Sequence, residues 1–375
     1  MLKLFSRRGL PTACLIFFAV VLCACSNSSN EAYEPASSAE QKFNWKMVTA
    51  WPPNLPVNHE VVTEFAADVE SMSRGQMTIQ VFAGGELIPA LEVFDAVSNG
   101  KTVQMGHGAA YYWAGKVPAA QYMSAVPFGL TARGMEAWMH GGGGLELWRE
   151  LYAPFDLMPF PMGNTGTQMG GWFNKRVESA ADLIGLKMRI PGLGGKTLAE
   201  AGGNPILLSG GEVYTALERG NIDATEWVGP LHDVRFGLDR AAKYYYYPGW
   251  HEPSTQLELI VNKTAWESLP EHLQKIIEKA ASAAGVALHA RMEVENAKAY
   301  AKLRESGHVE FVQFPHDVLA ALHASATRAL ESEAAKDENF RTVRDNYETF
   351  RKLFDAWDDI TEDAYREYFN RAAKN

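Results

Sequence analysis

Arg189 is the residue in this 375-residue chain whose position most favours binding a small anion. It lies in Leu186–Ile190, where apolar and basic residues alternate as they do in a strand, and Pro191-Gly192 ends that strand directly after it. In open α/β sheets, ligands bind at the carboxyl ends of strands. The planar guanidinium of arginine matches a carboxylate. We therefore expect Arg189 to bind a carboxylate; the alternative is a solvated or salt-bridged strand residue.

Glu226 is the acid that we expect beside Arg189, because residues 222–226 read as a strand that ends on the same rim. A glutamate next to a ligand carboxylate would repel it. Arg189 would offset one of the two negative charges, and a hard cation with oxygen ligands, Na⁺ or Ca²⁺, could bridge the rest. Gln168 offers an amide oxygen from a neighbouring strand. The alternative is a plain Arg189–Glu226 salt bridge.

Aromatic residues gather near the predicted strand ends. In the first half of the chain they include Tyr111, and in the second half Trp227 follows Glu226 directly. A dense run, residues 244–250 (YYYYPGW), precedes another predicted strand. We expect half of this run to be buried, and Tyr247 and Trp250 to line a cleft.

Two halves of the chain repeat one order of elements. Residues 92–100 (EVFDAVSNG) and 212–220 (EVYTALERG) share glutamate, valine, an aromatic, alanine and a closing glycine, about 120 residues apart. Helical and strand periodicities around them predict the same βαβαβ plan twice. The predicted elements are strand 45–50, helix 57–73, strand 77–82, helix 92–100 and strand 103–106, then strand 186–190, helix 195–201, strand 205–208, helix 212–220 and strand 222–226.

Two such lobes facing each other would form a clamshell that closes on a ligand. The predicted fold is therefore α/β, with a mixed sheet flanked by helices in each lobe and long C-terminal helices. We place lobe 1 at 43–165 plus 257–300, and lobe 2 at 166–256 plus 301–335. Residues 336–375 carry an apolar load that would pack on the lobes or on a second copy: Phe350, Leu353, Phe354, Trp357 and Tyr365.

Composition excludes several classes of function. The formal net charge is −10, which argues against nucleic acid as a partner because phosphate binding needs a basic face. All three cysteines, Cys14, Cys23 and Cys25, lie in the first 25 residues. The rest of the chain therefore has no thiol for a disulfide, a nucleophile or a cysteine-ligated metal.

The N-terminus has the features of an export signal. Residues 1–24 begin with basic residues and continue in an apolar run that is too short for a membrane span. Residues 22–25 (LCAC) resemble a bacterial lipobox with Cys25 as the lipidated residue, and plain cleavage nearby is the alternative. Residues 25–42 are small and polar, which is typical of a flexible tether. We expect a periplasmic protein, anchored through Cys25 if that cysteine is lipidated.

Four stretches carry a resemblance to a known family: 163–172 (GNTGTQMGGW), 186–192 (LKMRIPG), 223–230 (DATEWVGP) and 243–250 (KYYYYPGW). From residue 43 to about 284 the chain resembles the substrate-binding receptors of TRAP transporters, especially those for 2-oxo acids such as pyruvate. The resemblance implies a carboxylate-binding arginine at Arg189. It also implies a metal ion held by Gln168, Glu226 and the main-chain oxygen of Trp227. It further implies small and large membrane subunits as partners and, in some members, a dimer swapped through the C-terminal helix.

The sequence thus predicts a non-catalytic receptor for a small 2-oxo or 2-hydroxy monocarboxylate, with Gln168, Arg189, Glu226, Trp227, Trp250 and Tyr111 at its site. One alternative is the same receptor type for a C4-dicarboxylate. A second is an exported carbohydrate-active enzyme using Glu226 in an aromatic cleft. A third is an interaction protein that works through its helical tail.

Overall fold

A computed structural model describes residues 41–372, so the predicted signal peptide, Cys25 and most of the predicted tether lie outside the described residues. The strands are β1 (Phe43–Thr49), β2 (Met77–Phe82), β3 (Met105–Gly108), β4 (Leu157–Asn164), β5 (Gly171–Phe173), β6 (Lys187–Arg189), β7 (Asn204–Ile206), β8 (Ala224–Thr225), β9 (Tyr244–Tyr247), β10 (Gln256–Asn262) and β11 (Glu310–Gln313). The α-helices are α1 (Asn58–Met72), α2 (Val93–Asn99), α3 (Ala132–Gly141), α4 (Gly144–Tyr152), α5 (Gly192–Glu200), α6 (Gly210–Glu218), α7 (Pro230–Phe236), α8 (Leu238–Ala241), α9 (Lys263–Glu267), α10 (Glu271–Ser306), α11 (His316–Lys336), α12 (Glu338–Asp358) and α13 (Ala364–Ala372). Within residues 41–372, no helix is long and apolar enough to cross a membrane.

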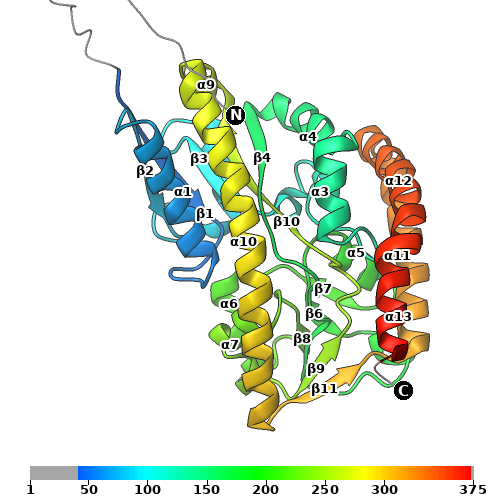
Figure 1. Ribbon diagram of the computed structural model, residues 1–375. Helices are drawn as coiled ribbons and strands as arrows, with labels where there is room; N and C mark the ends of the chain where they lie inside the picture. Colours follow the sequence, from blue (N-terminus) through cyan, green and yellow to red (C-terminus); the bar gives the residue numbers. More distant parts are fainter. Residues whose placement is uncertain (1–40, 373–375) are drawn as a thin grey trace, which may run out of the picture. The chain divides into compact units, whose positions relative to one another are not determined.

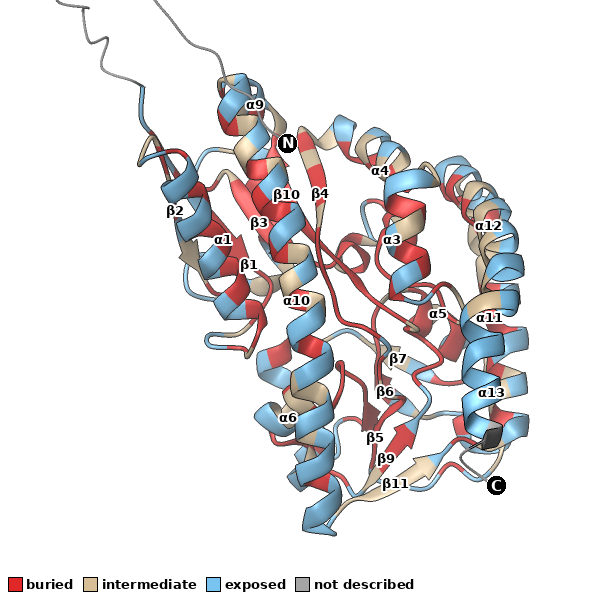
Figure 2. Cartoon of the chain, viewed as in Figure 1, coloured by how far each residue is buried: buried red, intermediate tan, exposed pale blue. Residues whose placement is uncertain are grey.

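The strands form two sheets, which lie one above the other in Figure 1. The first is five-stranded in the order β2-β1-β3-β10-β4, and the second is six-stranded in the order β11-β9-β5-β8-β6-β7. Helices cover the sheets on the outside, and buried residues concentrate on the strands and on the inner faces of those helices (Figure 2). The predicted two-lobed α/β architecture is confirmed.

The predicted internal repeat is also confirmed by the pairing of the strands. In the first sheet β1 pairs in parallel with β2 on one side and with β3 on the other. In the second sheet β6 pairs in parallel with β7 on one side and with β8 on the other. Each parallel pair is joined through a helix, as parallel strands require. The two lobes therefore place equivalent strand ends at their facing edges.

Two antiparallel strands and one long helix connect the sheets. β4 and β10 pair along their length in the first sheet, from Leu157 with Asn262 to Asn164 with Gln256, and the chain passes to the second sheet beyond Asn164 and before Gln256. Helix α10 packs on α1 and β4 of the first lobe and on α7 of the second (Figure 1). Its buried residues recur at helical spacing from Leu273 to Leu303, which accounts for its contact with both lobes.

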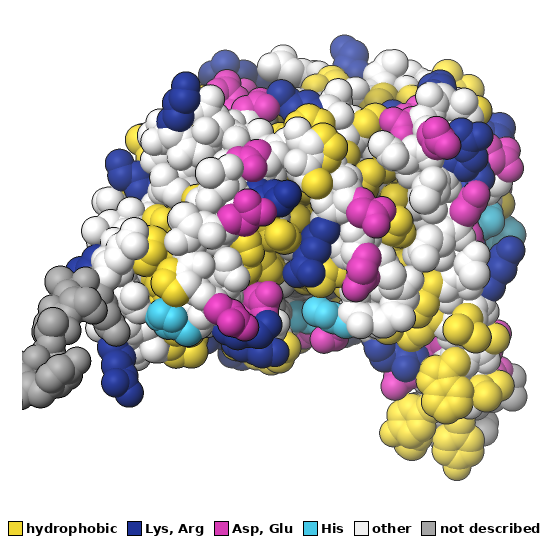
Figure 3. Space-filling view, turned by 90° about the horizontal axis from the view of Figure 1, so that it is seen from above, with side chains coloured by type: hydrophobic (Ala, Val, Ile, Leu, Met, Phe, Trp, Pro, Cys, Tyr) yellow, Lys and Arg dark blue, Asp and Glu magenta, His cyan; other side chains and the backbone are white. Residues whose placement is uncertain are grey.

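The C-terminal helices pack across both lobes, and their last part has an exposed apolar surface. Helix α11 packs on α5, and α12 packs on α4 and buries Phe340, Val343 and Tyr347. Beyond these residues the apolar side chains of α12 and α13 are largely exposed: Leu353 is 73% exposed, Trp357 57%, Tyr365 64% and Tyr368 68%. Figure 3 shows a projecting group of hydrophobic side chains on this part of the surface. The predicted apolar load is thus covered only in part by the chain's own lobes.

Candidate ligand-binding site

Arg189 ends β6, as predicted, but its side chain is buried at 1% exposure. Its Nε donates to the main-chain oxygen of Leu208 at 3.2 Å, and its Nη1 donates to the carboxylate of Glu226 in a short contact. The guanidinium carbon lies 4.7 Å from the centre of the Trp227 ring, a cation–π geometry. The solvated alternative for Arg189 is therefore wrong, and the salt-bridge alternative is present in the structure.

The remaining nitrogen of Arg189, Nη2, is fully buried and has no hydrogen-bond partner among residues 41–372. A buried donor without a partner is costly, so this nitrogen marks a position where an acceptor would be stabilised. The salt bridge with Glu226 uses Nη1 of the guanidinium and leaves Nη2 available for a ligand carboxylate. The two interpretations of Arg189 are thus compatible.

Glu226 follows β8 directly and is 1% exposed. Its Oε1 accepts from Arg189, and its Oε2 lies 3.4 Å from Nε2 of His251. Glu252 lies next to these groups, so that one ligand atom each from Glu226, His251 and Glu252 falls within 4.8 Å of the others. Burial and the Glu226 carboxylate raise the pKa of Glu252 to about 7. When Glu226 and Glu252 are both ionised, the site therefore holds two buried negative charges against the single positive charge of Arg189.

Gln168 lies beside this cluster and is 3% exposed. Its Nε2 donates to Glu252 at 2.8 Å. Its Oε1 is fully buried with no partner in the described part of the chain. An orphaned amide oxygen near two carboxylates is a donor set that suits a hard cation. Gln168 and Glu226, two of the residues predicted to hold the metal, thus offer buried oxygen atoms that suit such an ion.

Tyr111 and Trp227 lie where the two lobes meet. Both line a cavity of about 10 Å³ whose walls also include Trp51 and Leu55 of the first lobe and Val228 of the second. Gly192, just after Arg189, has φ +57°, and a Cβ there would lie 2.9 Å from the Cβ of Tyr111, so a glycine is needed at this approach. The two lobes are therefore in close contact beyond the end of β6, and the cavity between them is small.

A direct hydrogen bond also joins the lobes. Nε2 of His232 on α7 lies 2.9 Å from the main-chain oxygen of Pro56, which precedes α1. His232 is buried, and burial lowers its pKa to about 4, so the neutral ring makes this contact at neutral pH.

The aromatic run divides as predicted: Tyr245 and Tyr246 are fully buried, while Tyr247 is 40% exposed. Trp250 is buried against Phe128, with ring centres 6.0 Å apart, and against His251, with ring centres 5.4 Å apart. Trp250 therefore supports the site from behind His251. The prediction that Tyr247 and Trp250 line the cleft is not supported, because neither lines the cavity between the lobes.

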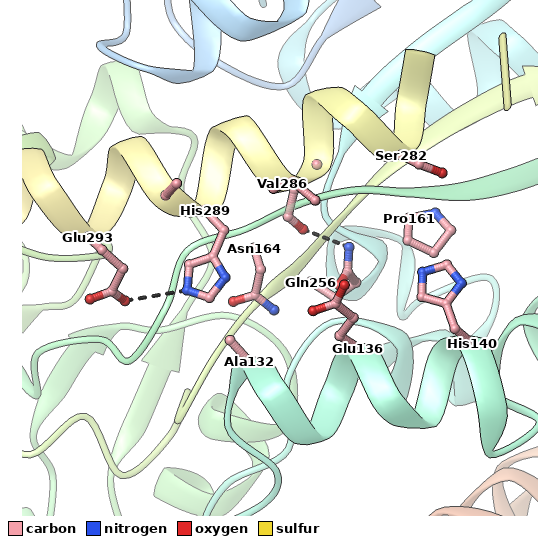
Figure 4. Close-up of a pocket in the computed structure, with 13 residues that line it drawn as sticks. Ala132, Glu136, His140, Pro161, Asn164, Gln256, Ser282, Val286, His289 and Glu293 are labelled. Carbon is pink, nitrogen blue, oxygen red and sulfur yellow. Dashed lines mark hydrogen bonds and ion pairs between the residues drawn. The ribbon is translucent and has the colours of Figure 1, made fainter. Parts of the chain in front are cut away.

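A separate groove of about 390 Å³ lies outside this site, between α3 and α10 (Figure 4). Its floor comes from β4 and β10, and its rim carries Glu136, His140, His289 and Glu293, the last two 3.5 Å apart. None of the six predicted site residues lines it.

Sequence reasoning missed Glu252, Thr165 and Thr255, which surround Gln168. Glu252 follows His251 in a Trp-His-Glu-Pro run. This His-Glu pair, directly after a buried aromatic run, was a signal from which Glu252 could have been predicted as a site residue. The threonines had none, because their role depends on β4 and β10 lying side by side.

Several known proteins are similar to this chain in sequence and in fold. Residues 47–337 match the family described as bacterial extracellular solute-binding protein, family 7. The chain is 39% identical over 364 residues to a monocarboxylate 2-oxoacid-binding periplasmic protein of Nostoc sp., covering 96% of this chain and 98% of that one.

Two solved structures resemble it over most of their length. One is a TRAP transporter solute-binding protein from Bordetella bronchiseptica, a mixed occupancy dimer with copurified calcium and picolinate in one active site (36% identity, TM-score 0.86, 89% of this chain and 99% of that one). The other is a TRAP periplasmic solute-binding protein from Pseudoalteromonas atlantica with bound sodium and pyruvate (40% identity, TM-score 0.85, 87% and 99%). These relatives are solute-binding proteins and not enzymes, which confirms the non-catalytic expectation, and this chain belongs to the bacterial extracellular solute-binding proteins of family 7.

Proposed function

We propose that this protein is the extracytoplasmic receptor of a TRAP transporter and that it binds a small 2-oxo or 2-hydroxy monocarboxylate together with a metal ion, Na⁺ or Ca²⁺. The observation that carries the proposal is the pair of orphaned polar atoms at one buried site, Nη2 of Arg189 and Oε1 of Gln168. The first is a charged donor for the ligand carboxylate, and the second is an oxygen ligand for the cation. Tyr111 and Trp250 would enclose the ligand.

Charge explains why the anion and the cation would bind together. Glu226 and Glu252, when ionised, carry two buried negative charges against the single positive charge of Arg189. A ligand carboxylate adds a third negative charge in a place of low dielectric, where unbalanced charge is expensive. A cation held by Gln168, Glu226 and the Trp227 main-chain oxygen would offset it.

A monocarboxylate fits this site better than a C4-dicarboxylate. A second carboxylate would need a second buried cationic side chain, and Arg189 is the only buried lysine or arginine among residues 41–370. The relative from Nostoc is named for monocarboxylate 2-oxoacids, and the Pseudoalteromonas structure holds pyruvate.

Isothermal titration with pyruvate tests the proposal, using protein that has been dialysed against chelator. We expect binding in the presence of Ca²⁺ or Na⁺ and at least a tenfold loss of affinity when choline replaces both ions. Succinate is the control for the dicarboxylate alternative. Absence of heat and of any tryptophan fluorescence change with pyruvate, 2-oxobutyrate and lactate, in every cation, would contradict the proposal.

The exposed apolar side chains of α12 and α13 support a homodimer. Isolated surface apolar residues are ordinary, but a contiguous group usually marks an interface, and Ile360 and Phe369 extend the group at 70% and 51% exposure. The Bordetella relative is described as a dimer. Light scattering should give a dimer for the exported chain and a monomer for a variant with Tyr365, Tyr368 and Phe369 changed to serine. A monomeric parent chain would exclude this interface.

Delivery to membrane subunits and lipidation at Cys25 complete the proposal. Transport in proteoliposomes should require this protein together with the small and large subunits of one TRAP system. Cys25→Ser should move the protein from the membrane fraction to the soluble periplasmic fraction. An unchanged distribution would favour plain cleavage of the signal peptide.

A further inference from the structure

The side chain of Gln168 has three polar neighbours on one side and none on the other. Its Nε2 lies 3.1 Å from Oγ1 of Thr165, 2.8 Å from Oε2 of Glu252 and 2.9 Å from Oγ1 of Thr255. Its Oε1 is fully buried and lacks a partner within residues 41–372. All four side chains are buried. The environment of the amide is therefore strongly asymmetric.

The three neighbours act as acceptors, which decides how the amide is turned. The Thr165 hydroxyl donates to the main-chain oxygen of Gly166 at 3.0 Å, and the Thr255 hydroxyl donates to Oε2 of Glu252 in a short contact. Each hydroxyl proton is thus already used, and only lone pairs face Gln168. The Glu252 carboxylate offers lone pairs only. An amide turned by 180° would place its oxygen against three acceptors, so the observed orientation is imposed by these partners.

We propose that Glu252 is a positioning residue for the cation: it accepts from Gln168 and fixes Thr255 as a second acceptor, so that the Gln168 oxygen is held toward the cation. The proposal rests on the proposed function, since it concerns the same cation. Partners of this kind fix the orientation of a metal ligand, and their loss typically lowers metal affinity 10- to 100-fold. Glu252 would act through Gln168 and not as a cation ligand itself.

The place of the two threonines makes this arrangement rigid. Thr165 follows β4 and Thr255 precedes β10, so each lies on one of the segments that connect the two sheets. The main-chain N–H of Thr165 donates to the Thr255 oxygen at 3.0 Å, and the Thr255 N–H donates to Oγ1 of Thr165 at 3.2 Å. The Gln168 amide is therefore held against both connecting segments at once.

The test compares Glu252→Gln with the full exported chain by titrating Ca²⁺ at a saturating concentration of pyruvate. The neutral amide can present a donor to Gln168, so the orientation of Gln168 is no longer imposed. We expect a 10- to 100-fold weaker affinity for Ca²⁺. Pyruvate affinity should return to within threefold of the parent value once Ca²⁺ is saturating.

Glu258→Gln is the matched control. Glu258 is an equally buried glutamate, but it accepts from Trp113 and Tyr152 in the first lobe, and its pKa is likewise raised to about 7 by burial. The same chemical change there should leave the Ca²⁺ affinity within twofold. A loss as large as that of Glu252→Gln would mean that any buried charge change disturbs the protein, and it would overturn the proposal.

Thr255→Val separates positioning from direct ligation. It removes an acceptor of Gln168 and leaves both carboxylates in place. A positioning role therefore predicts a smaller loss of Ca²⁺ affinity, about three- to tenfold. The same variant tests the proposal if Glu252→Gln does not fold. An unchanged affinity in Thr255→Val, with a loss in Glu252→Gln, would make Glu252 a direct ligand and overturn the proposal. If the parent chain binds pyruvate with Ca²⁺ and Glu252→Gln does so equally well, only this inference fails. If the parent chain shows no cation-dependent binding of pyruvate, both the proposed function and this inference are contradicted.

Discussion

Replacing Arg189 by lysine is the substitution that separates charge from geometry at the site. Lysine keeps a positive charge beside Glu226 but lacks the planar fork. In the structure one arm of that fork is used by Glu226, and Nη2 is the arm without a partner. If the ligand carboxylate binds Nη2, Arg189→Lys loses one charge-assisted hydrogen bond, worth about 1.5–3 kcal/mol. That corresponds to a rise in Kd for pyruvate of roughly 10- to 150-fold.

Arg189→Ala should behave differently because it also damages the fold. It leaves the Glu226 carboxylate buried at 1% exposure without its cationic partner, a change that typically costs about 3–5 kcal/mol. Adding Glu226→Gln removes the unpaired charge, so the double variant should regain most of this stability. The two substitutions should therefore be strongly coupled in a double-mutant cycle measured by urea unfolding.

The assays are pyruvate titration by calorimetry in saturating Ca²⁺ and urea unfolding of the same proteins without ligand. A Kd for Arg189→Lys within threefold of the parent value would refute the assignment of Nη2 to the ligand. Additive stability effects of Arg189→Ala and Glu226→Gln would refute the buried pairing as the reason for the destabilisation.

Three further outcomes are expected. Burial raises the pKa of Asp233 to about 7, so its stabilising contribution is complete below its unfolded pKa near 4 and is lost progressively as the pH rises through 7. Asp233→Asn should therefore gain stability relative to the parent at pH 8 compared with pH 5, by up to about 2.6 kcal/mol, and equal pH profiles would contradict this. The Tyr347 hydroxyl accepts from the main-chain N–H of Leu130 at 2.7 Å in a buried position, so Tyr347→Phe should cost about 1–3 kcal/mol in urea unfolding, whereas exposed Tyr365→Phe should cost nothing measurable. Pyruvate with Ca²⁺, each at 100 times its Kd, should raise the unfolding free energy by at least about 2.7 kcal/mol, and a melting temperature insensitive to both would count against the proposed ligand pair.

The sequence was sufficient for the architecture because the pattern of apolar residues is repeated. The two copies of the Glu-Val-aromatic helix predicted equivalent strand orders, and the pairing of β1 with β2 and β3 matches that of β6 with β7 and β8. Element ends were less well predicted. The strand expected over 222–226 is only Ala224–Thr225, so Glu226 follows the strand instead of belonging to it. The C-terminal region beyond residue 336, expected to form long helices, is divided into α12, a π-helical turn at Asp359–Asp363 and α13.

The burial of the site could not be predicted from the sequence. Alternation in residues 186–190 placed Arg189 on the same face as Lys187, which is exposed, and left a solvated Arg189 as one alternative. The difference comes from residues distant in sequence: the ring of Trp227 covers the guanidinium of Arg189, and Tyr111 of the other lobe approaches Gly192. A contact between residues so far apart in sequence depends on how the lobes close, and periodicity carries no information about that.

Closure and charge together suggest why this site would select its ligand as a pair of ions. The hydrogen bond of His232 to Pro56 and the contact of Gly192 with Tyr111 close the lobes over a region in which Arg189 is the only buried lysine or arginine of residues 41–370. Closing these lobes over an anion alone would bury an excess of negative charge, and closing them over a cation alone would leave Nη2 of Arg189 without an acceptor. Each ion therefore lowers the cost of burying the other, and by linkage each must raise the other's affinity by the same factor.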